Sequence, residues 1–240
     1  PTRVLTRGDY RQPAEPVEAG FLTAIAGKSE PAVIEQDRYR QFPTRGWRIT
    51  LGKWIANKDN PLTARVMVNR IWQYHFGTGI VATPSDFGVN GERPTHPELL
   101  DWLGHEFIES GWSVKAMHRL ILQSATYRQA AENPKDDKLY SRFPRRRLQA
   151  EEIRDGILYL SNRLNPIRGG PSVFPALPAD LADFARYGRG GALMWETNAD
   201  EADMRRRSIY TFQRRSMPLP MMAAFDAPVF SESCDRRSAT

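Results

Sequence analysis

Apolar residues recur at helical spacing along most of the chain beyond residue 46, and this pattern predicts a mainly helical fold. The clearest helix spans residues 61–76. Asn60 precedes it as a capping residue, Pro61 occupies its first position, and Gly77 follows as a left-handed stop. The apolar arc of this helix is wide, which predicts a buried, central helix. The arc comprises Leu62, Val66, Met67, Ile71 and Trp72.

Shorter amphipathic stretches predict helices over residues 48–57 and 95–110, and another that begins at the capping residue Ser113. Residues 147–164 predict a further helix with a stripe of apolar residues at helical spacing. The stripe comprises Ile153, Ile157, Leu160 and Leu164. The one strand signal is the β-branched and aromatic segment 208–213. The expected fold is an irregular helical domain with long ordered loops and a small β element near 208–213.

The chain divides by composition near residue 46. Residues 1–46 are polar and rich in proline, so we expect an extended N-terminal arm. Residues 47–240 are expected to form a single helical domain. No segment reaches the roughly 18 consecutive apolar residues that a membrane span needs. The single cysteine, Cys234, excludes an internal disulfide. The chain opens on Pro1 without a methionine, which indicates a piece excised from a longer protein.

The net charge is +6, from 34 basic and 28 acidic residues. Arginines cluster at residues 145–147 and 205–207, which is compatible with phosphate or nucleic-acid binding. Carboxylates stand beside these clusters, so arginine–carboxylate pairing within the fold is the favoured alternative. We therefore expect no specific binding of DNA or RNA.

Polar residues follow one line along the central helix. Arg65 and Asn69 are four residues apart, and the loop after the helix carries Asp86. A polar line on a buried helix has to be satisfied by hydrogen bonds. Two interpretations fit: a polar ligand pocket facing residues 83–90, or a structural network that fixes this loop. A ligand site would comprise Arg65, Asn69, His75 and Asp86, with Arg65 holding Asp86 or an acidic ligand.

The four histidines, His75, His96, His105 and His118, show no metal-binding spacing. We therefore expect no metal site, and His75 is expected to be a packed, hydrogen-bonded side chain. No nucleophile elbow, phosphate-binding loop or dinucleotide fingerprint is present. Two classes of function remain: a non-catalytic scaffold or interaction domain, and a hydrolase-type enzyme with its site on the central helix and the 83–90 loop.

Several ordered motifs resemble the planctomycete-specific domain of unknown function. They are Asn60-Pro-Leu-Thr-Ala-Arg, Thr83-Pro-Ser-Asp-Phe-Gly, Thr95-His-Pro-Glu-Leu-Leu, Gln123-Ser-Ala-Thr-Tyr-Arg, Arg207-Ser-Ile-Tyr, Gln213-Arg-Arg-Ser-Met-Pro and Cys234-Asp-Arg-Arg. The resemblance covers about residues 7–240, and the family pattern continues past Cys-x-Arg-Arg, so truncation at the C-terminus is expected.

The resemblance also carries expectations about context. It implies a large, exported, periplasmic protein that often includes a cytochrome-c-like module. Haem c would then belong to a neighbouring module, and no cofactor is expected in this chain. The partners implied are other domains of the parent chain, with polysaccharide as a further candidate. The resemblance implies no activity.

Overall fold

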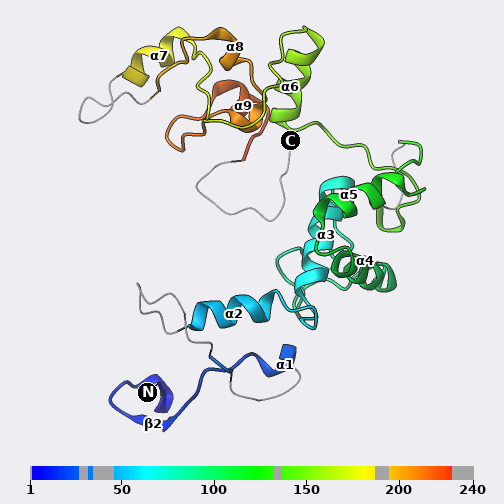
Figure 1. Ribbon diagram of the computed structural model, residues 1–240, viewed down its shortest axis with the longest axis vertical. Coiled ribbons are helices and arrows are strands. Elements are labelled where there is room, and N and C mark those ends of the chain that lie inside the picture. Colours follow the sequence, from blue (N-terminus) through cyan, green and yellow to red (C-terminus); the bar gives the residue numbers. More distant parts are fainter. Residues whose placement is uncertain (1, 27–31, 35–45, 132–136, 187–194, 229–240) are drawn as a thin grey trace. The chain divides into compact units, whose positions relative to one another are not determined.

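The computed structural model describes residues 2–26, 32–34, 46–131, 137–186 and 195–228. Helices predominate among these residues, as predicted (Figure 1). The chain forms two compact units, Pro1–Arg145 and Arg146–Thr240. The boundary between the units lies inside the range 47–240, which the sequence analysis treated as one domain.

The first unit begins with a small antiparallel sheet. Strand β1 (Arg3–Leu5) pairs with β2 (Pro13–Pro16), and the short 3-10 helix η1 (Thr6–Gly8) lies between them. Helix α1 (Thr23–Ala26) follows. Phe21 stacks on Trp54 of α2, with 4.7 Å between the ring centroids, so the arm contacts α2 through this ring.

Helix α2 (Trp47–Ile55) precedes three longer helices, α3 (Thr63–Phe76), α4 (Pro97–Glu109) and α5 (Val114–Gln123). Helix α3 begins at Thr63, two residues later than predicted, with Leu62 as its N-cap residue. Asn60 caps the turn that leads into α3, because its Oδ1 accepts hydrogen bonds from the backbone nitrogens of Leu62 (3.0 Å) and Thr63 (3.3 Å). Gly77 ends α3 with a φ of 82°, which confirms the predicted stop. The hydroxyl of Ser113 caps α5 at 3.2 Å.

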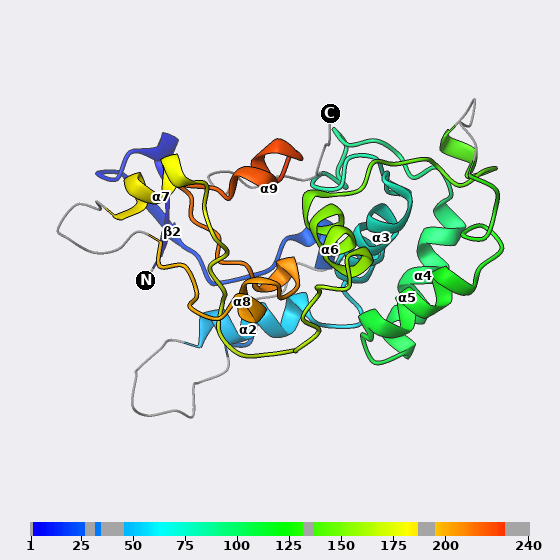
Figure 2. The same cartoon turned by 90° about the horizontal axis from the view of Figure 1, so that it is seen from above.

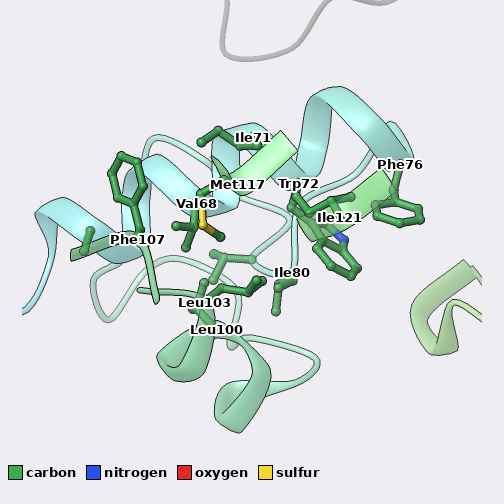
Figure 3. Packing of buried hydrophobic residues seen from close by; sticks show 12 residues of the cluster. Val68, Ile71, Trp72, Phe76, Ile80, Leu100, Leu103, Phe107, Met117 and Ile121 are labelled. Carbon is green, nitrogen blue, oxygen red and sulfur yellow. The ribbon is translucent and has the colours of Figure 1, made fainter. Parts of the chain in front are cut away.

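The core of the first unit lies where α3, α4 and α5 pack against one another (Figures 1 and 2). Figure 3 shows these buried side chains, with Ile80 reaching in from the loop after α3. The buried residues of α3 are Ala64, Val68, Asn69, Ile71, Trp72 and Phe76. The prediction that Met67 belongs to this face is wrong: its side chain is 36% exposed. Ile71 and Trp72 of the predicted arc are buried, as predicted, and Val68 lies on the buried side in place of Met67.

Within residues 146–186 and 195–228, the second unit contains η3 and four α-helices, of which α6 is the longest. They are α6 (Ala150–Leu160), α7 (Ala179–Arg186), α8 (Glu201–Met204), η3 (Ser208–Tyr210) and α9 (Pro220–Ala224). Its core consists of Ala150, Trp195, Met217, Leu219 and Met222, with Phe174 and Phe212 packed against it. Helix α6 contacts α9 and η3. None of the helices in the described ranges is both long and apolar enough to cross a membrane.

The prediction of a strand over residues 208–213 is wrong. Residues 208–210 form the 3-10 helix η3, and the β element is reduced to one parallel bridge between Val173 and Thr211. Two backbone hydrogen bonds of 2.8 Å join Val173 to Tyr210 and Phe212. Thr211 is buried and Phe212 packs against the core of this unit without forming a ladder, whereas Ile209 is exposed.

Candidate functional site

Arg65 does not hold Asp86, the partner that the sequence analysis offered for it. Its Nε lies 2.6 Å from Oδ1 of Asp101 on α4, and its Nη1 donates to the carbonyl of Pro61. Arg65 therefore ties the first turn of α3 to α4. The pair is partly open to solvent, with side-chain exposures of 36% and 57%, so its contribution to stability is small.

Asn69 is fully buried and binds a single peptide segment. Its Nδ2 donates to the carbonyl of Val81 at 3.0 Å, and the backbone nitrogen of Val81 donates to its Oδ1 at 2.9 Å. A Cβ at Gly79 would lie 2.6 Å from Nδ2 of Asn69, so this close approach requires glycine. The Asn69 amide thereby fastens the loop after α3 to the helix. It makes the two hydrogen bonds to Val81 that a neighbouring strand would make in a sheet.

Asp86 organises its own loop. Its Oδ1 accepts from the backbone nitrogen of Gly88 at 2.8 Å, and its carbonyl accepts from the Thr83 hydroxyl at 2.8 Å. The Thr83 hydroxyl in turn accepts from the backbone nitrogen of Glu92 at 2.9 Å. Asp86 and Asn69 thus bind different segments of the loop, and neither shares a polar partner with Arg65 among the hydrogen bonds of the described residues.

His75 belongs to a separate cluster of rings. Its Nε2 lies 2.8 Å from Nδ1 of His118 on α5, and its ring meets Tyr127 edge-on at 5.5 Å. Tyr127 also packs on Phe76 and Phe143. His75 is thus packed and hydrogen-bonded, as the sequence analysis expected, but its partner from α5 was not anticipated. The four predicted site residues are consequently distributed over separate sets of contacts.

Tyr140 closes the other end of this ring cluster. It packs edge-on against Trp72 at 5.1 Å and contacts Phe76 and His96. Burial raises the pKa of the Tyr140 hydroxyl, and hydrogen bonding from the side chains of Trp72 and Thr95 opposes this rise. The opposing effect of Trp72 is weak, because the buried Nε1 of Trp72 makes no hydrogen bond of ordinary length and angle. We attribute the shift to burial.

The second unit contains a buried polar cluster that sequence reasoning missed. Arg154 on α6 is 7% exposed, and its guanidinium donates to the carbonyls of Met204 (2.7 Å) and Arg206 (2.9 Å) and to the Ser208 hydroxyl (3.2 Å). Oδ1 of Asp155 lies 3.8 Å from Arg154 and accepts 2.7 Å bonds from both the hydroxyl and the backbone nitrogen of Ser208. This cluster joins α6 to the start of η3.

Electrostatics at Arg154 follows from its burial. Removal from water lowers the pKa of the Arg154 guanidinium, and the charge of Asp155 opposes the change. The group nevertheless stays charged near neutral pH. The Ser208 hydroxyl donates to a carboxylate, as the hydroxyl of a catalytic nucleophile can. Ser208 is only 2% exposed, however, so a substrate cannot reach it in this arrangement.

Arg206 fixes the glycine-rich loop after α6. Its guanidinium donates to the carbonyls of Pro171, Ile167 and Gly169 and lies 4.1 Å from the centre of the Tyr210 ring. The Tyr210 hydroxyl accepts from the backbone nitrogen of Gly169 at 2.8 Å. The sequence pointed to this site through the run of arginines at 205–207. Periodicity could not show that Arg206, the middle residue of the run, is buried.

The predicted apolar stripe of α6 is only partly buried: Ile153 and Leu164 are half-buried, and the other two residues are exposed. Ile157 is 53% exposed and Leu160 is 85% exposed, whereas Arg154 and Ala150 are buried. The hydrogen bonds of Arg154 to segment 204–208 hold its side of α6 inward, and they leave Ile157 and Leu160 exposed.

The described residues contain no group of three or more histidine, cysteine, aspartate or glutamate side chains placed to hold a metal ion. Comparison with known proteins gives one match: a family model described as PSD1, protein of unknown function (DUF1553), covers residues 47–240. The curated proteins and the solved structures give no match. The family match begins at the first residue of α2 and includes both the ring cluster and the arginine cluster.

Proposed function

The chain belongs to the PSD1 family of proteins of unknown function (DUF1553), and we propose that it is a non-catalytic interaction domain of a larger exported, periplasmic protein. The observation that carries this proposal is the orientation of α6. The helix buries a charged side chain, Arg154, and presents the aliphatic residues Ile157 and Leu160 to solvent. Exposed aliphatic stripes of this kind are typical of surfaces that bind other polypeptides.

The buried polar side chains bind backbone groups of the same chain, which supports the same proposal. Asn69 binds the Val81 peptide, and Arg154 and Arg206 bind backbone carbonyls. An enzyme site needs polar groups that converge on a space open to substrate. The hydrolase alternative requires Arg65, Asn69, His75 and Asp86 to converge in this way. Each of these side chains instead binds a different partner. The interaction function is therefore preferred.

Helix α2 adds a second uncovered apolar surface in the first unit. Its exposed side chains are Trp47, Ile49, Leu51 and Ile55. Most of the exposed apolar side chains on α2 and α6 are aliphatic. A protein partner matches this chemistry better than a sugar ring, which stacks on aromatic faces. We propose that the partners are other domains of the parent chain, a cytochrome-c-like module among them.

A charge placed on the α6 stripe tests this function in the intact parent protein. Leu160→Asp should leave the folded domain intact, because the side chain is exposed, and should release the docked neighbour. The expected result is a lower sedimentation coefficient and faster proteolysis between domains. The matched control is Val89→Asp, which adds the same charge at an exposed apolar position in the first unit. Equal behaviour of Leu160→Asp and wild type would refute docking on α6.

Two further assays on the same intact protein separate the alternatives. Binding on a glycan array that Tyr159→Ala abolishes and Leu160→Asp preserves would identify polysaccharide as the partner. Turnover in a broad hydrolase screen that is lost in Asp86→Ala, with an unchanged unfolding midpoint, would establish the enzyme alternative.

A further inference from the structure

Neighbouring arginines occur in four runs along the chain, and the fold holds these runs in different ways. They comprise residues 145–147, 205–207, 214–215 and 236–237, and the last run lies outside the described residues. Among the three described runs, residues 145–147 alone lie wholly in a segment without helix, strand or turn. We propose that the peptide bond between Arg146 and Arg147 is a processing site for an endopeptidase that recognises paired arginines.

The backbone before this bond is available to a protease. Proteases bind their substrates as extended strands, through backbone hydrogen bonds beside the bond that is cut. Within the described ranges, no backbone hydrogen bond involves Pro144, Arg145 or Arg146. Residues 145–148 are all exposed. The segment can therefore enter a protease cleft without prior unfolding of a helix or strand.

The residues before the run favour cleavage after Arg146 over cleavage after Arg145. The backbone nitrogen of Phe143 donates to the carbonyl of Ala130 at 3.1 Å, and the Phe143 ring packs in the ring cluster of the first unit. Cleavage after Arg145 would require Phe143 in the cleft, two residues before the cut. Cleavage after Arg146 places Pro144 at that position, so Phe143 keeps its contacts.

The Arg146 side chain is weakly held. It is 38% exposed, and its guanidinium lies 3.7 Å from the carboxylate of Glu152. An exposed pair of this kind contributes about 0–1 kcal/mol, so an acidic pocket of the protease can replace Glu152. Hydrolysis then adds one water molecule across the bond. The water hydroxyl joins the carbonyl carbon of Arg146 to give a carboxyl group, and the water hydrogen joins the nitrogen of Arg147 to give an amine.

The other described runs are held within the fold. Arg206 is 4% exposed, and its backbone carbonyl accepts a 2.9 Å hydrogen bond from the guanidinium of Arg154. The carbonyl of Arg214 accepts a 3.2 Å hydrogen bond from the backbone nitrogen of Met217, which closes a turn over residues 215–216. A protease that requires an extended substrate is therefore excluded from both runs while the protein is folded.

Cleavage after Arg146 leaves both hydrophobic cores complete. The core of the first unit extends to Phe143, and the core of the second unit begins at Ala150. Each product therefore keeps its own buried cluster and should remain folded. Processing would separate the unit that carries α6 from the first unit, whatever partner α6 binds.

Digestion of the folded chain with kexin, an endopeptidase that cleaves after paired basic residues, tests the proposal. Mass spectrometry should show a product that begins at Arg147, while residues 205–207 and 214–215 stay uncut. Arg146→Gln should slow this cleavage at least about tenfold, because the acidic pocket of the protease loses its charged ligand. The matched control is Arg215→Gln, which removes an exposed arginine of another pair and should leave the rate unchanged.

Digestion in urea gives the reference, because all runs should be cut once the fold no longer protects them. Cleavage of the folded chain at residues 205–207 or 214–215 as fast as after Arg146 would overturn the proposal. The parent protein isolated from its own cells should also contain a chain that begins at Arg147, and complete absence of this chain would contradict processing. Neither measurement depends on whether α6 binds a neighbouring domain, so the two proposals fail separately.

Discussion

Replacement of Asn69 by alanine probes the contact that fixes the loop after α3. Both polar atoms of the Asn69 side chain bind the peptide groups of Val81, and Val81 is only 2% exposed. Asn69→Ala therefore leaves one buried N–H and one buried C=O without partners. Water cannot easily replace the amide, because Ile80 and Val81 lie in the core.

The expected cost can be worked from these two groups. A buried donor or acceptor that loses its partner costs about 1–3 kcal/mol. Two such groups, partly relieved by a small shift of the loop, predict a destabilisation of about 2–5 kcal/mol. A ligand-binding role for Asn69 without a structural role would predict a much smaller change in stability.

Urea unfolding followed by tryptophan fluorescence measures this effect in the relevant unit. Of the six tryptophans, all except Trp195 lie in the first unit, so the signal reports chiefly on that unit. The control is Arg70→Ala at an exposed position of α3, which should change the free energy of unfolding by no more than about 0.5 kcal/mol. An unfolding midpoint in Asn69→Ala equal to that of the control would refute the reasoning.

Four more predictions follow from the structure. Gly156→Ala should stabilise the second unit by about 0.5–1 kcal/mol, because a Cβ there meets nothing within 4 Å. Gly79→Ala should destabilise the first unit, because its Cβ would lie 2.6 Å from Nδ2 of Asn69. Thermal unfolding measures both effects. Arg154→Met should destabilise the second unit by about 2–5 kcal/mol in denaturant unfolding, because it leaves the buried carbonyls of Met204 and Arg206 without their donor. Because burial raises the pKa of Tyr140 in the folded state, its stabilisation is complete below pH about 10 and is lost as the pH rises through the folded pKa; Tyr140→Phe should therefore reduce the alkaline fall in melting temperature. Fluorescence anisotropy should show no DNA or RNA binding that persists at physiological salt, since several exposed arginines are paired with carboxylates.

Local signals predicted the parts of the fold that depend on neighbouring residues. Asn60 caps the turn that leads into α3, Gly77 ends α3 and Ser113 caps α5. In each case the determining contact lies within a few residues. Such contacts can be derived from residue type and spacing, because they need no knowledge of the tertiary structure.

Tertiary contacts determined the features that the sequence left open or indicated wrongly. Periodicity located the stripe of α6 but could not show which side meets the core, since that depends on Arg154 and carbonyls about 50 residues away. The partner of Arg65 is 36 residues away on α4, and Asp86 was only one of several carboxylates that could have filled the role. The His75–His118 pair joins two helices whose relative rotation no short motif specifies.

Hydrogen exchange of α6 tests the interaction function most directly. Backbone amides of residues 150–160 would be followed by mass spectrometry in this chain alone and in the intact parent protein, with α5 as an internal reference. The proposed function predicts slower exchange of α6 in the parent protein, with unchanged exchange of α5, and loss of that protection in Leu160→Asp. Identical exchange of α6 in both proteins would contradict the proposal that its aliphatic face binds a neighbouring domain.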